Sequence, residues 1–142
     1  MTEKILSYLS ECPALETIYI SVDYLGREIY SGSLSGVGKK QTVRTYTDGD
    51  TLKLCTYTLY LRLPYGIDKL QNLENIRRLE EFTLWLSENS KAGVLPELSG
   101  SNIPISVRGQ ARSEPERTAA GSAVFAVDIE VLYYSTKKNE RM

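Results

Sequence analysis

Two pairs of carboxylates have the spacing in this sequence that best suits acid–base chemistry. Asp48 and Asp50, and likewise Asp128 and Glu130, are two residues apart, so on a β-strand both members of a pair lie on one face. Paired carboxylates act as acid and base in some enzymes, but on strands they more often pair with lysine or arginine across the sheet. We expect the second role here, with Lys53 and Arg62 as partners, because they lie on a strand that could pair with residues 123–134.

The sequence contains no histidine among its 142 residues. Without histidine there is no imidazole general base, no histidine-activated nucleophile and no imidazole metal ligand. The two cysteines, Cys12 and Cys55, are too few for a structural zinc site or a disulfide framework, and we expect both to be reduced and buried. The Walker A, GxSxG, HExxH and CxxC motifs are also absent from the sequence. We therefore expect a protein that is not an enzyme and that holds neither a cofactor nor a metal.

The ten tyrosines are an unusually large number for a chain of this length. A tyrosine on a strand either packs with its hydroxyl at the edge of the core or contributes to a protein–protein surface, and the residues alone favour neither alternative. For the second alternative, candidates are taken from the polar faces and loops of the expected strands. The candidate oligomer interface comprises Tyr46, Tyr60, Arg62, Lys39, Lys40, Arg112 and Arg117.

Composition and charge limit the class of protein and of partner. The net charge is −1, from 17 basic and 18 acidic residues, so no overall basic excess favours nucleic acid. No apolar run approaches the ~20 residues of a membrane span. We expect neither sequence-specific nucleic acid nor membrane among the partners. The length fits one domain, expected over residues 1–136, followed by a short, frayed charged tail at 137–142.

The first half of the chain contains one helical and several strand patterns. Apolar spacing predicts a helix over residues 3–10, and alternation of apolar and polar residues predicts a strand over 17–24. The Gly/Ser-rich stretch 31–38 predicts a flexible loop or an irregular edge strand, since it lacks the spacing and the following helix of a phosphate-binding loop. Residues 43–63 predict a hairpin with its turn at Asp48-Gly49. An EF-hand loop from Asp48 fails, because its closing position would be a leucine.

The second half begins with helical spacing. We expect a short helix over 68–74 and a main helix over 76–91, with Asn75 as the N-cap of the second helix. We expect the apolar face of the main helix to pack on the apolar face of the last strand. That helix face comprises Ile76, Leu79, Phe82, Thr83 and Leu86.

The remaining residues predict two strands and a loop. Alternation favours strands over 103–108 and 123–134, and residues 109–122 have no apolar anchor. The resulting order, α-β-β-β-α-β-β, lacks the regular β-α-β alternation of a doubly wound parallel sheet. We expect an α+β fold: an antiparallel or mixed sheet of four to five strands with two helices on one face.

Six short motifs, taken together in their order and spacing, resemble a family of small virion proteins from long-tailed phages and prophages of Gram-positive bacteria. The resemblance covers roughly residues 5–96 and thins beyond them. The motifs are Ile5-Leu6-x-Tyr8-Leu9-x-x-Cys12-Pro13, Ile20-Ser21-Val22-Asp23-Tyr24-Leu25-Gly26, Tyr46-Thr47-Asp48-Gly49-Asp50-Thr51-Leu52-Lys53, Asn72-Leu73-Glu74-Asn75, Glu81-Phe82-x-x-Trp85-Leu86 and Gly93-Val94-Leu95-Pro96.

Members of this family are called minor capsid or tail terminator (tail completion) proteins. The resemblance implies a head–tail joining (neck) role as a homo-oligomer, a hexameric ring at the head-proximal end of the tail tube. It implies the tail tube protein and head–tail connector proteins as partners, assembly in the host cytoplasm and a place in the virion; it implies no catalytic residue. Residues 110–117 and the stretch 31–38 depart from the family pattern. The alternative from another class is a monomeric non-catalytic binding or regulatory domain that uses its polar sheet face.

Overall fold

The computed structural model describes residues 1–98, 100 and 102–136, so the expected tail at 137–142 lies outside the described residues. The described part is α+β, with two α-helices, one short 3-10 helix and seven strands. In chain order the elements are α1 (Thr2–Leu9), η1 (Pro13–Leu15), β1 (Tyr19–Val22), β2 (Ser31–Leu34), β3 (Lys39–Thr45), β4 (Thr51–Pro64), α2 (Lys69–Ala92), β5 (Ile103–Ala111), β6 (Arg117–Ala119) and β7 (Ser122–Ser135).

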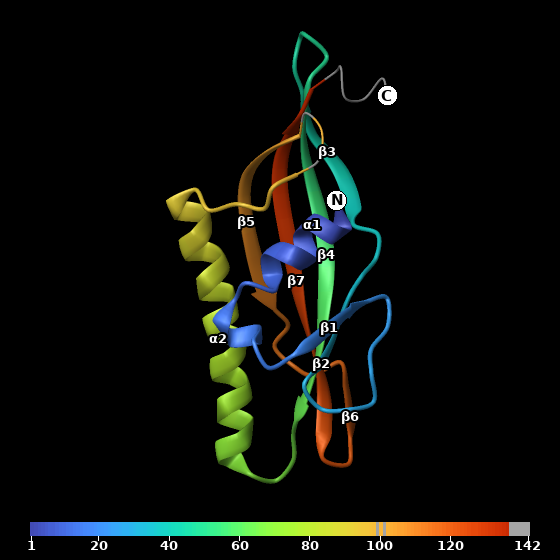
Figure 1. The fold of residues 1–142 in the computed structure, drawn as a ribbon, viewed down its shortest axis with the longest axis vertical. Coiled ribbons are helices and arrows are strands. Elements are labelled where there is room, and N and C mark those ends of the chain that lie inside the picture. Colours follow the sequence, from blue (N-terminus) through green and yellow to red (C-terminus); the bar gives the residue numbers. More distant parts are fainter. Residues whose placement is uncertain (99, 101, 137–142) are drawn as a thin grey trace.

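The strands form one mixed sheet in the order β1-β2-β4-β7-β5, with β3 also beside β4 and β6 also beside β7. Its centre is the antiparallel pair of β4 and β7, each 14 residues long and paired along its whole length. β1 and β2 run parallel, whereas the other strand pairs are antiparallel. Figure 1 shows the two central strands along the long axis of the molecule. The sheet is therefore larger than the expected four to five strands, and the expected element order was wrong.

Both α-helices pack on the same face of this sheet (Figure 1). The odd-numbered residues of β4 and β7 point to that face, because side chains alternate along a strand. The hydroxyl of Tyr57 lies 3.3 Å from Thr2 Oγ1 of α1. On the β5 side, a Cβ on Gly109 would lie 2.7 Å from Leu86 Cδ1, so glycine lets α2 approach the sheet closely. We call this side the covered face and the opposite side the open face.

The helix between β4 and β5 is continuous, which corrects the expected break. Asp68 is its N-cap and accepts a hydrogen bond from the Leu70 backbone N–H at 2.9 Å. Asn75 lies inside the helix and is 2% exposed. Its side-chain amide donates to the Pro64 carbonyl at 2.6 Å, which satisfies this buried polar group. Leu79, Phe82 and Leu86 of the expected apolar face are buried. Ile76 was wrongly assigned to the core, since it is 50% exposed.

The stretch 31–38, expected to be a flexible loop or an irregular edge strand, and the stretch 109–122, expected to be a loop, both contain strands. In the stretch 31–38, Ser31–Leu34 forms β2, whose last three residues are buried. A Cβ at Gly32 would lie 3.1 Å from side-chain atoms of Ile20 and Leu61, so this glycine serves packing rather than flexibility. In the stretch 109–122, β5 continues to Ala111 and β6 forms beside the start of β7. β2 and β6 form because each pairs with a long neighbouring strand, β4 or β7, which supplies backbone hydrogen bonds. The local sequence pattern does not predict this pairing.

Other expectations are confirmed. α1, the last strand and the hairpin turn at Asp48-Gly49 form as expected, and Gly49 has the positive φ of 92° that favours glycine. Cys12 and Cys55 are 1% and 0% exposed, and burial raises the pKa of both thiols. Within the described residues, no helix is both long and apolar enough to cross a membrane.

Candidate interaction surface

The open face is the surface that carries the carboxylates and tyrosines noted in the sequence. It is built from the even-numbered residues of β4 and β7, which pair directly across the sheet, Thr58 with Asp128 and Leu54 with Leu132. The even-numbered side chains are half-buried along β4 and from Asp128 to Tyr134 of β7, whereas Ser122, Val124 and Ala126 at the start of β7 are buried. Their odd-numbered neighbours are buried, apart from Lys53. Neither α-helix covers them (Figure 1). The sheet register therefore determines which polar groups meet on this face.

An ion-pair network lies at the middle of the open face. The Arg112 guanidinium donates to both Asp128 carboxylate oxygens, at 3.0 and 3.2 Å, and also binds Glu116. Thr58 Oγ1 donates to Asp128 at 3.1 Å. The hydrogen bonds from Arg112 hold the pKa of Asp128 below its ordinary value. Asp128 thus stays ionised and paired, which suits a structural role better than proton transfer.

The second carboxylate of this pair is also neutralised. Glu130 accepts two hydrogen bonds from the Arg108 guanidinium, at 2.8 and 3.0 Å. Arg108 stands directly opposite Glu130 in the β5–β7 register. Cross-strand pairing of the carboxylates was expected, but the cations come from β5 and the residue that follows it, not from β4.

At the hairpin end, the open face becomes aromatic and apolar. The Tyr134 hydroxyl donates to the Asp50 carboxylate, which raises the pKa of Tyr134 to about 12. The ring of Tyr46 lies 5.7 Å from that of Tyr134, and Arg44 lies 6.0 Å from the Tyr46 ring centre. The half-buried side chains of Leu52, Leu54 and Leu132 continue this apolar end along the sheet.

At the end of the open face away from the hairpin, one row contains two arginines, Arg62 and Arg117. Arg62 and Arg117 both stand opposite Val124, so the two arginines share one row across the open face. The Arg62 Nε donates to the Gly26 carbonyl at 2.9 Å, which ties β4 to the loop after β1. Tyr60 stands opposite Ala126 in the next row, toward the middle of the sheet.

All of the predicted interface residues except Lys40 thus lie on the open face, but they do not form one cluster. Tyr46 lies at the hairpin end, Arg112 in the middle, and Arg62 and Arg117 at the far end. Lys39 stands opposite Thr56 on the open face, whereas Lys40 stands opposite Cys55 and points to the covered side. The sequence did not identify Arg108, Glu116 or Leu132 as part of this surface, because only the strand register places them there.

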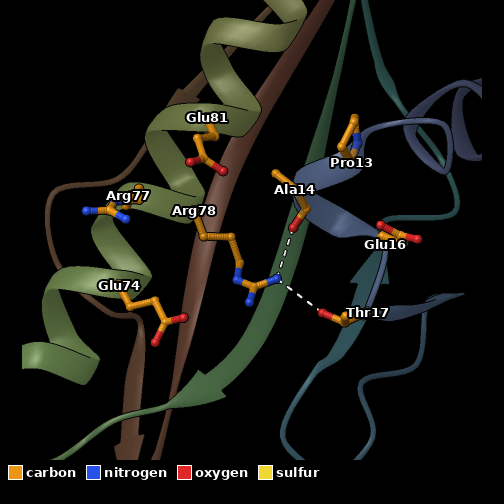
Figure 2. A pocket seen from close by; sticks show the side chains of 8 residues that line it. All are labelled: Pro13, Ala14, Glu16, Thr17, Glu74, Arg77, Arg78 and Glu81. Carbon is orange, nitrogen blue, oxygen red and sulfur yellow. Dashed lines mark hydrogen bonds between the residues drawn. The ribbon is translucent and has the colours of Figure 1, made fainter.

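A second polar site lies between η1 and α2, in a cleft of about 310 Å³ (Figure 2). Arg78 reaches across the cleft and donates from Nη1 to the Ala14 carbonyl at 3.0 Å and to Thr17 Oγ1 at 3.2 Å. Its guanidinium also lies 5.3 Å from the centre of the Tyr30 ring. Figure 2 shows Arg77 pointing away from η1. Arg78 therefore joins the helix to the η1–β1 segment, and its contacts are structural.

The charged groups at the centre of both sites already form hydrogen bonds with neighbouring residues. The described residues include no cluster of three or more Cys, Asp or Glu side chains that could hold a metal ion. Asp128 and Glu130 accept hydrogen bonds from arginine, and desolvation raises the pKa of the buried Tyr57 to about 12. Among known proteins, neither a family model nor a curated sequence matches this chain.

Proposed function

We propose that this chain is a non-catalytic structural protein of a phage virion, of the tail terminator or head–tail joining type, which works as a hexameric ring. The proposal rests on the ordered motif resemblance across residues 5–96 and on one structural observation, the open face. That face is a long, ordered surface with an apolar end, an ion-paired middle and an arginine row, and neither α-helix covers it.

The physical properties of the open face favour protein–protein contact. Side chains held by ion pairs, such as Arg112 and Asp128, lose less conformational freedom when a partner binds. Leu54, Leu132 and Tyr134 offer the apolar area that supplies binding energy at the centre of an interface. We place the tail tube protein or a connector protein against this face.

The test is to mix the purified protein with purified tail tubes and to image the tubes. The expected result is a ring at one tube end, with further growth of the tube blocked. A variant with Leu54→Lys and Leu132→Lys places two charges directly opposite each other on the open face and should abolish end binding. Ile76→Lys, on the exposed side of α2, is the matched control and should bind as the parent does.

Two results would contradict the proposal. Decoration along the whole tube, or no binding of the parent protein, removes the terminator role and favours the monomeric binding or regulatory domain. End binding that survives both leucine substitutions removes the open face as the contact surface.

A further inference from the structure

A groove beside α2 is rimmed by carboxylates and floored by apolar side chains. Glu81 and Glu88 are seven residues apart on the helix, so they lie on one stripe. Leu84 lies between them on that stripe and is 56% exposed. The groove has a volume of about 200 Å³. Its lining comprises Cys12, Pro13, Ala14, Glu81, Leu84, Trp85 and Glu88.

This groove is acidic. None of the basic residues in the described part of the chain lines it, and neither Glu81 nor Glu88 has an ion-pair partner there. Figure 2 shows Glu81 beside the neighbouring cleft, where Arg78 donates to the Ala14 carbonyl and to Thr17 Oγ1. The groove therefore presents two unneutralised carboxylates around an exposed leucine.

The free edge of β3 has the opposite character. All seven residues of β3 are exposed, and within the described residues the strand pairs with β4 alone. Lys39 and Lys40 point to opposite sides of the sheet, because they stand opposite Thr56 and Cys55. Val43 is 52% exposed and is followed by Arg44. The edge therefore presents cations around an exposed apolar residue.

On the opposite side of the sheet, β5 and β6 pair with β7, and α2 lies beside β5. The Val107 backbone N–H of β5 donates to Ser90 Oγ of α2 at 3.2 Å, so the helix already uses this edge donor. Lysines along β3 also discourage direct strand addition. The β3 edge and the α2 side of the sheet therefore favour contacts through side chains rather than through an added strand. Figure 1 shows α2 and β3 on opposite sides of the molecule.

We infer that the β3 edge of one copy docks into the α2–η1 groove of a second copy. The lysines of one surface meet the carboxylates of the other, and Val43 meets the floor around Leu84. Because the two surfaces differ and lie on opposite sides, the contact is heterologous and repeats from copy to copy, as a ring requires. The inference rests on the proposed ring function and names the surfaces that join neighbouring copies. Of the residues that it uses, only Lys39 also borders the open face, so the rest of that face stays available to the virion partner.

The test uses two charge-reversed variants of the full chain. The edge variant carries Lys39→Glu and Lys40→Glu, and the groove variant carries Glu81→Lys and Glu88→Lys. Each variant then has like charges on both surfaces, so self-association at low salt, measured by sedimentation, should weaken more than about tenfold. An equimolar mixture should recover association, because each acidic surface then meets a basic one. Arg27→Glu and Glu114→Lys, on other exposed sites, are the controls and should leave association unchanged.

A zero-length carbodiimide cross-linker supplies a second readout on the parent protein. Isotope-mixed samples should yield cross-links between copies that join Lys39 or Lys40 to Glu81 or Glu88. Unchanged association of both variants, no recovery in the mixture, or a parent that stays monomeric overturns the inference. Tube ends capped by both reversed variants would remove this interface and keep the proposed function. Association of copies through this interface without binding to tail tubes would support the interface and contradict the proposed function.

Discussion

The two faces of the sheet are built from the same strands, but the covered face forms the core and the open face carries polar side chains. In β4, Leu59 and Leu61 are 0% exposed on the covered face, whereas the alternate residues Tyr60 and Arg62 are half-buried on the open face. The backbone ladder is common to both, so the difference comes from what packs on each side. The helices bury the covered face and stabilise the fold, which leaves the open face able to carry polar groups for binding.

The largest expected effect is on the covered face. Phe82→Ala removes a fully buried ring of α2 and should lower the free energy of unfolding by about 3–5 kcal/mol. Ile76→Ala, on the same helix but 50% exposed, is the control and should change it by less than about 1 kcal/mol. Denaturant unfolding measures both. Equal losses of unfolding free energy in the two variants would contradict the placement of Phe82 in the core and of Ile76 at the surface.

A smaller effect is expected from the network on the open face. Asp128→Asn removes one charge of an exposed pair and should lower the free energy of unfolding by about 1 kcal/mol or less. The folded pKa of Asp128 lies below its ordinary value of 3.8, so this stabilisation is present above that pH. It should disappear as the pH falls through the lowered pKa. A difference between parent and variant that persists at all pH values would contradict a charge-based role; Glu114→Gln is the exposed control.

The smallest effect on stability is expected from Asp50→Asn, which changes the environment of Tyr134. This variant compares the two faces through the pKa of one tyrosine on each, Tyr57 and Tyr134. The pKa of Tyr57 on the covered face and of Tyr134 on the open face are each raised to about 12. Burial is the main cause for Tyr57, and the hydrogen bond to Asp50 is the main cause for Tyr134. Asp50→Asn should therefore bring the pKa of Tyr134 back toward 10 and leave that of Tyr57 high.

Tyrosinate absorbance during an alkaline titration follows both groups. Tyr134→Phe assigns the transition of Tyr134, because it removes that hydroxyl from the tyrosines whose pKa is raised. If Asp50→Asn leaves the late transitions unchanged, the carboxylate is not what holds the Tyr134 proton.

Patterns with strict periodicity predicted their elements well. The alternation from residue 123 onward identified β7, and Asp48-Gly49 identified the hairpin turn, because both signals are local. The break expected at Asn75 was wrong for a tertiary reason: its side chain bonds the Pro64 carbonyl, which compensates for an asparagine inside a helix. β6 was missed, and β2 was predicted only as an alternative to a loop, because short polar strands depend on the neighbour with which they pair.

The candidate surface was predicted only in part. Residue type identified Tyr60 and Arg62, because polar residues that alternate with leucines must leave the core. The partners of Asp128 were not predicted, since Arg112 lies in a stretch without periodicity. The acidic groove and the basic edge each look like ordinary solvated charge in the sequence, and only their placement makes them complementary.

Composition and local periodicity were enough to predict the fold class, the two central strands, the burial of both cysteines and the lack of any histidine chemistry. Only the folded chain shows the strand register, the continuity of α2, the cations that neutralise Asp128 and Glu130, and the pairing of β3 with β4 alone among the described residues. These features depend on contacts between residues far apart in the chain. A one-residue shift of register would exchange the two faces, and no local pattern encodes which neighbour a polar strand will meet.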